Sequence, residues 1–213
     1  EEPRIIRQFK ANLEFTGGTA VKYDTSYLFA EGKHQALAKG EAIGRRFHSA
    51  PVVRLSDAKQ MQLGHAAEAD ARWRIYAFAS KGDVGQPGAG IARLADWLEN
   101  DQASPVVKHT RKGEDIDAII DVRAVFQPTF DQLDYGQMPS LLKPRTGKLG
   151  LTDHEKIFCV DHKGLGDIYD MRGINREQGC LIVVRPDQYV ANVLPPDAYG
   201  ELSAYFAGVL VTR

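Results

Sequence analysis

The sequence predicts an α/β fold in which helices flank a mixed β-sheet, preceded by an N-terminal helix and an irregular lead-in segment. From residue 51 onward, short apolar runs alternate with amphipathic stretches. Near the end, two apolar runs are joined by the turn Arg185-Pro186-Asp187-Gln188. The order strand, helix, strand, helix, strand pair, helix is that of a thioredoxin-like sheet, which carries one antiparallel hairpin on a mixed sheet. A segregated α+β sandwich is the alternative.

The first fifty residues are predicted to form a lead-in. A helix is expected over residues 3–14, where apolar residues recur at helical spacing. These residues are Ile5, Ile6, Phe9 and Leu13. The pair Gly17-Gly18 ends the helix. Residues 19–50 show no regular periodicity, so we interpret them as an irregular segment that packs against another part of the protein; a flexible arm is the alternative. The aromatic residues of this segment include Tyr23, Tyr27 and Phe29.

Six strands are expected after the lead-in, because apolar, β-branched and aromatic residues cluster between turn signals. They cover residues 52–55, 72–79, 118–126, 156–160, 180–184 and 189–194. The second of them is the first core strand, and Arg72 begins it. Alternation of side chains directs Trp73 and Ile75 to one side of this strand. Arg74 and Tyr76 point to the other side.

Amphipathic stretches between the strands predict the helices. One apolar face indicates a helix over residues 91–98. Residues 130–142 are interrupted by a glycine and a proline, so any helix there is short, and residues 168–174 allow one or two helical turns. Asp197 is predicted to cap the last helix, whose apolar stripe we assign to the core. The stripe consists of Leu202, Tyr205, Phe206, Val209 and Leu210.

Composition indicates a globular, cytoplasmic protein. The chain has 213 residues, 43% of them hydrophobic, which is ample for one domain and an attached segment. The net charge is -1 and both signs are interspersed, so we expect no surface for nucleic acid or anionic membranes. No apolar run approaches ~18 residues, so no membrane span is expected, and the charged first residues predict no signal peptide. Two cysteines favour a reducing cytosol.

The position at which a thioredoxin-like enzyme carries its redox thiol holds no cysteine in this sequence. A thioredoxin-like enzyme needs a thiolate at the N-terminus of the helix that follows the first core strand, where the helix dipole lowers the thiol pKa. Residues 80–87 occupy that place and contain no cysteine. Cys159 and Cys180 fall in predicted strands and form no redox-active CxxC pair. We interpret each of them as a small buried hydrophobe.

Two other patterns are similar to cofactor or metal sites. The run Gly88-Ala89-Gly90-Ile91-Ala92-Arg93 follows a strand and opens a helix, as a dinucleotide fingerprint does. Its third glycine is replaced by Arg93, whose side chain is expected to obstruct close helix–strand packing, so we interpret the stretch as a loose surface loop. His154, Cys159 and His162 suggest a metal, but their spacing fits no zinc pattern, and solvated or hydrogen-bonded histidines are expected.

Several carboxylates are candidates for acid–base chemistry, and we interpret them as surface charge on helices and strands. They are Glu41, Asp57, Asp70, Asp115, Asp117 and Asp121. The sequence contains no G-x-S-x-G elbow and no Walker loop. We therefore assign no catalytic, cofactor-binding or metal-binding residue to this chain.

Several stretches resemble, in the same order, the C-terminal region of the FAD-dependent aromatic hydroxylases that include phenol 2-monooxygenase and 3-hydroxybenzoate 4-hydroxylase. They are FTGGTAVKY (15–23), GRRFHSAPVVRL (44–55), RWRIYAF (72–78), YDMRGI (169–174) and VVRPDQYVA (183–191). The resemblance continues through Leu194-Pro195 and residues 202–208, so it covers nearly the whole chain.

The resemblance implies a parent flavoprotein that uses NADPH to reduce FAD and hydroxylates phenol or a phenolic acid such as 3-hydroxybenzoate. The FAD and substrate domains come first in that family, so neither FAD nor NADPH is expected on this part of it. Residues 1–50 would be the tail of the FAD/substrate domain and a connector whose aromatic residues are exposed in isolation. Residues 51–213 would be a thioredoxin-like C-terminal dimerisation domain. The implied partners are the upstream domain of the same protein and a second copy in a homodimer.

Two other functions fit the same fold. A free-standing oxidoreductase predicts a reactive cysteine of low pKa. A stand-alone thioredoxin-like binding module predicts a stable monomer with no parent chain upstream. The turn Arg185-Pro186-Asp187 either only shapes the hairpin or also makes a contact there.

Overall fold

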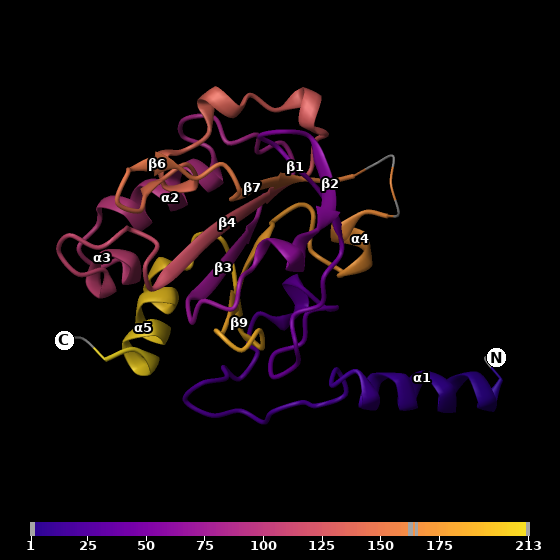
Figure 1. The fold of residues 1–213 in the computed structure, drawn as a ribbon. Coiled ribbons are helices and arrows are strands. Elements are labelled where there is room, and N and C mark those ends of the chain that lie inside the picture. Colours follow the sequence, from indigo (N-terminus) through magenta and orange to yellow (C-terminus); the bar gives the residue numbers. More distant parts are fainter. Residues whose placement is uncertain (1–2, 162–163, 165, 212–213) are drawn as a thin grey trace.

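A computed structural model describes residues 3–161, 164 and 166–211. Its centre is a seven-stranded mixed sheet in the order β2-β1-β7-β4-β3-β8-β9 (Figure 1). The strands of this sheet are β1 (Pro51–Arg54), β2 (Lys59–Gln62), β3 (Trp73–Phe78), β4 (Ile120–Phe126), β7 (Ile157–Cys159), β8 (Cys180–Val184) and β9 (Val190–Leu194). A separate hairpin consists of β5 (Arg145–Thr146) and β6 (Leu151–Thr152).

Helices precede, connect and follow the strands. The α-helices are α1 (Arg4–Thr16), α2 (Gly90–Asn100), α3 (Pro105–His109), α4 (Ile168–Met171) and α5 (Tyr199–Val209). The 3-10 helices are η1 (Gln35–Leu37), η2 (Leu63–Ala66), η3 (Phe130–Gln132), η4 (Tyr135–Gln137) and η5 (Ser140–Leu142). The predicted short helix over 130–142 is thus three separate turns. Within the described ranges, no helix is both long and apolar enough to cross a membrane.

Four neighbouring strands, β4, β3, β8 and β9, have the predicted topology. β3 pairs in parallel with β4 and antiparallel with β8, and β8 pairs antiparallel with β9. From β4 across the sheet to β9, the four strands are therefore the second, first, third and fourth of the set along the chain. Helices α2 and α3 lie in the crossover between the parallel strands β3 and β4, and α5 follows β9. A parallel pair needs such a crossover, whereas a segregated sandwich does not. The thioredoxin-like mixed sheet is confirmed.

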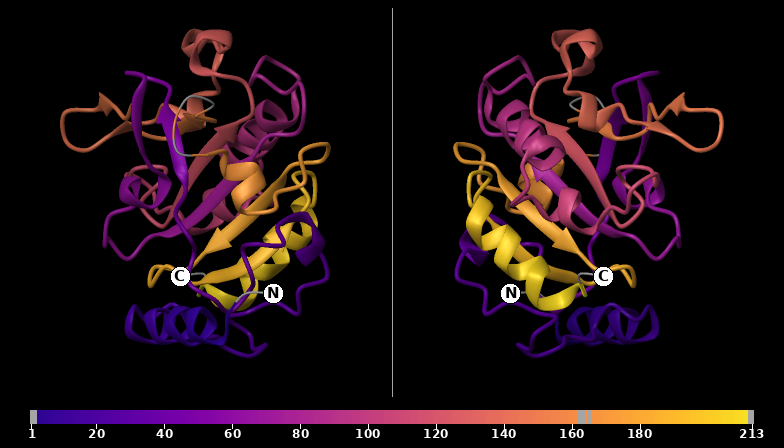
Figure 2. Two further views of the ribbon diagram at one scale, coloured as in Figure 1. Left: turned by 90° about the vertical axis from the view of Figure 1, so that its right-hand side faces the viewer. Right: turned by 90° about the vertical axis from the view of Figure 1, so that its left-hand side faces the viewer.

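Each face of the sheet has its own core. Trp73 and Ile75 lie in the core under α2, α3 and α5, and the ring centroids of Trp73 and Phe206 are 5.7 Å apart. Tyr76 lies in the opposite core, with residues of the lead-in and α4. Figure 2 shows α5 on one side of the sheet and the lead-in on the other. The predicted alternation along β3 is therefore confirmed, and it gives the protein two apolar layers to cover.

The lead-in is irregular, as predicted, and it covers one of these layers. Its backbone joins the β9 edge, where Ala30 N–H donates to the carbonyl of Ala191 (2.9 Å) and Gly44 N–H donates to that of Val190 (2.8 Å). Phe29 of the lead-in is buried. The expectation that the lead-in aromatics are exposed is therefore wrong for this residue. Tyr23 and Tyr27 are exposed, and their expected exposure is confirmed.

Helix α1 extends away from the rest of the protein (Figures 1 and 2). Its apolar residues face solvent: Ile5 is 82% exposed, Phe9 64% and Leu13 56%. The predicted amphipathic helix is therefore present, and its apolar stripe contacts no core within the described residues.

The sequence prediction differs from the structure at several ends and edges. Asp197 does not cap α5: the N-cap is Ala198, and no side chain caps it. The strand β2, the helix α3 and the β5–β6 hairpin were not predicted, because β2 is a polar edge strand and the others are very short. For α3 the signal was present, since Ser104 accepts hydrogen bonds from Val106 and Val107 N–H and Pro105 begins the helix.

Candidate functional site

The loop after β3 holds an aspartate where a thioredoxin-type enzyme holds its thiol. Asp83 is 5% exposed. Its Oδ2 accepts from Ile91 N–H in the first turn of α2 (2.8 Å), and its Oδ1 accepts from Gly85 N–H (2.9 Å). The partial positive charge at this helix N-terminus is therefore already neutralised by a carboxylate of the chain itself.

The interpretation of the glycine-rich stretch as a loose loop is wrong from Gly90 onward, because α2 begins there. The contacts of Asp83 also hold the loop that precedes it. Gly85 has a φ of +79°, and a Cβ on it would come within 2.6 Å of the Met138 sulfur. Glycine is therefore required at this position by both backbone conformation and space.

Arg93 does not block the start of α2, contrary to the expectation from the sequence. Arg93 is exposed and donates to the Gly88 carbonyl, so it does not obstruct helix packing. The residues of α2 that pack on the sheet are Ile91, Leu94, Ala95 and Leu98. What opposes a pyrophosphate here is the Asp83 carboxylate, because it occupies the amide that would bind a phosphate and carries the same sign of charge. The residues of this helix start do not fit FAD or NADPH.

A cleft of about 540 Å³ lies over this end of the sheet. Lys33 and His34 of the lead-in line one side of it. Both are paired with Glu201 of α5, at 3.1 Å each. These pairs join the lead-in to the last helix beside the cleft.

Both cysteines are buried, as predicted. Cys159 and Cys180 are free and 0% exposed. Burial raises the pKa of Cys159 to about 12 and also raises the pKa of Cys180. They lie on β7 and β8, which β4 and β3 separate. The strands β7 and β8 are therefore three strand spacings apart, about 14 Å, whereas a disulfide requires Cα atoms within about 7 Å. The fold therefore keeps the two thiols protonated and apart.

Two of the three residues suggested for a metal cluster, His154 and Cys159, lie in the described part of the chain. His154 Nδ1 lies 2.6 Å from the Tyr135 hydroxyl, so this histidine is hydrogen-bonded, as expected. Cys159 is enclosed in the sheet, and His162 lies outside the described residues. Among the residues that the structure describes, no three His, Cys, Asp or Glu side chains are arranged to hold a metal ion.

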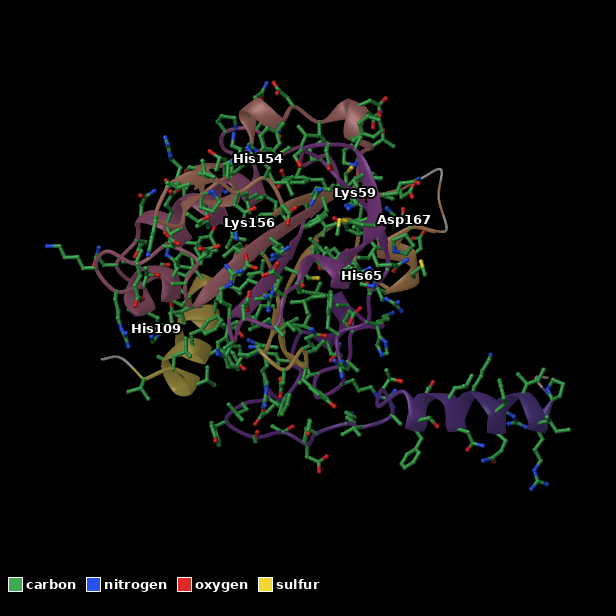
Figure 3. The ribbon with its side chains drawn as sticks, viewed as in Figure 1. Lys59, His65, His109, His154, Lys156 and Asp167 are labelled. Carbon is green, nitrogen blue, oxygen red and sulfur yellow. The ribbon has the colours of Figure 1, made fainter. Side chains whose placement is uncertain are left out.

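Buried charges cluster at the start of β3 and β4, and we call this set the charge network. It consists of Asp70, Arg72, Arg74, Asp117, Asp121, Arg123 and Lys156. Lys156, labelled in Figure 3, joins Asp117 and Asp121 through its Nζ at 2.6 Å each. Arg123 Nε lies 2.8 Å from Asp121. The network ties β4 to the segment that enters β7.

The interpretation of the carboxylates as surface charge is wrong for Asp117, Asp121 and Glu41, which are 5%, 0% and 1% exposed. Burial alone would raise the pKa of Asp121, but Arg123 and Lys156 hold it below its ordinary value. Asp121 therefore stays ionised and paired, and it is not a free base. A signal was present in the sequence, because Asp121 and Arg123 stand two positions apart on one side of an apolar strand.

The other three carboxylates lie nearer the surface. Asp57 is exposed and pairs with Arg54 at 2.7 Å. Asp70 belongs to the charge network and is half-buried. Asp115, also half-buried, accepts from Gly147 N–H at 2.8 Å. These contacts support loops and strand ends.

Glu41 is a buried carboxyl of the lead-in with incomplete pairing. Its Oε2 accepts from His48 N–H (3.1 Å). Within the described residues, its Oε1 has no hydrogen-bond partner and lies 3.5 Å from Arg172 Nε, which also has none. Burial raises the pKa of Glu41 to about 8, although the hydrogen bond from His48 and the charge of Arg172 oppose the rise. The sequence analysis names Glu41 as a carboxylate but interprets it as surface charge, because its burial depends on the lead-in folding over the sheet.

The hairpin turn makes a contact in addition to shaping the chain. Arg185 Nη2 pairs with Asp187 at 2.7 Å, and the Arg185 guanidinium lies 4.7 Å from the centre of the Phe29 ring. The turn therefore holds the lead-in against β8 and β9 through a cation–π contact.

Exposed apolar side chains form two groups that could bind another surface. One is the stripe on α1. The other is the β5–β6 hairpin, where Leu149 is 81% and Leu151 66% exposed. Figure 2 shows this hairpin projecting from the body of the protein.

Comparison with known proteins gives a consistent family. A family model described as phenol hydroxylase, C-terminal dimerisation domain, matches residues 21–213. The chain is 50% identical over 201 residues to a 3-hydroxybenzoate 4-monooxygenase of Comamonas testosteroni, covering 94% of this chain and 32% of that protein. It is 36% identical over 198 residues to the FAD-dependent monooxygenase terD of Aspergillus terreus, covering 90% and 32%. The chain thus spans about a third of the length of these relatives.

Similarity to solved structures is lower. A putative protein disulfide isomerase from Bacteroides thetaiotaomicron aligns over 79% of this chain and 87% of its own, with 9% identity and a TM-score of 0.45.

Proposed function

The chain belongs to the phenol hydroxylase C-terminal dimerisation domain family, and from this premise we propose that it is the assembly domain of an FAD-dependent aromatic-ring monooxygenase. The observation that carries the proposal is the match of the family model to residues 21–213. We further propose that the parent enzyme uses NADPH, and that its substrate is phenol or a phenolic acid such as 3-hydroxybenzoate. The identity to a 3-hydroxybenzoate 4-monooxygenase supports this substrate class.

The chemistry of such an enzyme belongs to the part of the protein upstream of this chain. The helix N-terminus that could bind a dinucleotide is occupied by Asp83. We therefore propose no catalytic or cofactor-binding residue here, and derive no reaction step. The contribution of this chain is to hold two copies of the enzyme together.

We propose the same division of the chain as the sequence suggested. Residues 1–50 are the tail of the FAD/substrate domain and a connector, and residues 51–213 are the dimerisation domain. The exposed apolar stripe of α1 supports the first part, because such a stripe is typical of a helix that packs against another domain. The connector covers the second core as well, so it belongs to both.

Two measurements on the 213-residue chain test the proposal. Sedimentation equilibrium is expected to give twice the monomer mass, and the visible absorption spectrum is expected to lack flavin bands. A monomer at high micromolar concentration contradicts the assembly role. Bound flavin at one per chain contradicts the upstream location of the FAD site.

The same experiment locates the interface. Leu149→Asp with Leu151→Asp places two charges on the β5–β6 hairpin, and Phe9→Asp with Leu13→Asp places two on α1. The pair that lies in the interface is expected to yield monomers, while the other pair leaves the dimer unchanged. Dimers that persist in both double variants exclude both surfaces.

We also propose a cytoplasmic location for the protein. The support is that both thiols are free rather than cross-linked, as is usual in reducing compartments. Recovery of the protein in the membrane or exported fraction of fractionated cells contradicts this location.

A further inference from the structure

A small cavity lies on the lead-in side of the sheet, where four segments meet. It is lined by Phe47 and Ser49 of the lead-in, His65 beside Gly64 in η2, Arg74 and Tyr76 of β3, and Gln188 of the β8–β9 turn. Its volume is about 160 Å³. An apolar cavity of roughly 150 Å³ holds one benzene molecule, so this one has the size of a single aromatic ring. His65, labelled in Figure 3, lies at its exposed rim.

The lining of the cavity includes Tyr76, whose side-chain hydroxyl has no hydrogen-bond partner within the described residues. Tyr76 is 1% exposed, and its ring stacks on Phe47 at 4.5 Å between centroids. Its hydroxyl makes no hydrogen bond within the described residues, yet it is not among the fully enclosed polar atoms. The hydroxyl therefore meets accessible space, and the cavity is the space that Tyr76 lines. A buried hydroxyl without a partner is costly, so an acceptor placed in the cavity gains a hydrogen bond there.

Other groups around the cavity are donors as well. Arg74 uses three of its five N–H groups, one on the Arg72 carbonyl, one on the Glu68 carbonyl and one on Asp70. Gln188 accepts from Arg46 through Oε1, which leaves its amide NH₂ free to donate. No aspartate or glutamate lines the cavity.

The charge at the entrance favours an anion. Arg74 lies 3.5 Å from Asp121, so the charge network neutralises it and it serves as a donor. Arg46 differs: it is exposed and has no ion-pair partner in the described ranges. Its contact with Gln188 (3.4 Å) places this free positive charge beside the entrance.

We propose that this cavity binds a small aromatic carboxylic acid of the size of benzoate. The ring lies beside Phe47, and the carboxylate accepts from Tyr76 and faces Arg46 and Gln188. This site does not depend on the proposed function, since its lining comes from a single chain.

Isothermal titration calorimetry of the 213-residue chain with sodium benzoate tests the site. Saturable binding at one site per chain is expected, with weaker binding of benzamide, which has the ring without the charge, and of acetate, which has the charge without the ring. Tyr76→Phe keeps the ring stack and removes only the hydroxyl, and Arg46→Gln removes the charge. Each is expected to weaken benzoate binding about tenfold, the effect of one hydrogen bond to a charged group.

Two more variants make the result decisive. Ala67→Leu, on the cavity lining, is expected to abolish binding by filling the space without removing any polar group. Tyr27→Phe, at an exposed lead-in tyrosine, is the matched control and is expected to bind benzoate like the wild type. Circular dichroism verifies that each variant is folded.

Absence of saturable heat, equal binding of benzamide or acetate, or wild-type affinity in the Tyr76→Phe and Ala67→Leu variants overturns the proposal. Sedimentation measures the dimer in a separate experiment, so a monomeric chain would contradict the assembly role without changing the outcome of the benzoate titration.

Discussion

Among single residues, the buried charges differ in how well they are paired. Asp121 has Arg123 and Lys156 within 2.8 Å. A buried charge with such partners remains ionised, and removing one partner is strongly destabilising. Glu41 has only one backbone hydrogen bond and a distant guanidinium. Its ionised form is therefore poorly stabilised, and this difference makes Glu41 a side chain through which pH acts on the lead-in.

Stability is expected to fall as pH rises through the range in which Glu41 ionises. The carboxyl binds its proton with a pKa of about 8 in the folded chain and about 4.5, the ordinary value, when unfolded. The folded state thus holds more protons between these values, so the stabilisation is complete below about pH 4.5 and is lost by pH 8. Urea denaturation of wild type and Glu41→Gln measures this. The advantage of the Gln variant is expected to grow with pH by a few kcal/mol, on the order given by the shift.

The control is Glu31→Gln, which neutralises an exposed carboxylate of the same lead-in. It is expected to follow the wild-type pH dependence. A constant difference between Glu41→Gln and the wild type from pH 5 to 9 would show that Glu41 does not titrate in this way.

At the level of elements, helix α2 shows how a side chain of the preceding loop can occupy a helix N-terminus. The helix begins behind a buried strand, as in a thioredoxin-like enzyme, but a carboxylate of the preceding loop satisfies its first amide. That carboxylate also fixes the loop through Gly85. The helix N-terminus that could face a thiolate therefore faces the Asp83 side chain instead.

Replacing Asp83 with alanine is expected to destabilise the domain by about 1–3 kcal/mol, because two buried N–H groups lose their acceptor. Asp96→Ala, on the exposed side of the same helix, is the matched control and is expected to have little effect. Chemical denaturation measures both. Equal stability of the two variants would mean that the loop is held by its packing and not by the carboxylate.

In the whole molecule, the two faces of the sheet are covered by different parts of the chain. Helices α2, α3 and α5 cover one face, and they all follow β3 in sequence. The other face is covered by residues that lie before the first strand, including Phe29, Ala38 and Ile43, and by α4. Helix α1 contributes to neither core. The lead-in is therefore structural over residues 26–50, while α1 is available for another domain.

Truncation separates these two parts. Removal of residues 1–16 is expected to leave the thermal midpoint nearly unchanged, because α1 buries no core residue in this structure. Removal of residues 1–50 is expected to expose the second core and give a loosely packed state that binds a hydrophobic dye and lacks near-ultraviolet circular dichroism. A cooperative thermal transition of residues 51–213 alone would contradict the structural role of the lead-in.

By itself, the sequence determined the features that depend on neighbours along the chain. The alternation in β3, the β8–β9 hairpin with its turn, the amphipathic α1 and the strand positions of Cys159 and Cys180 follow from local pattern, and all are confirmed. Only the tertiary structure decided which polar groups are buried. Asp121, Glu41 and Tyr76 receive their surroundings from segments tens of residues away. Burial, and the charge state that follows from it, depends on packing between distant segments, which no local pattern records.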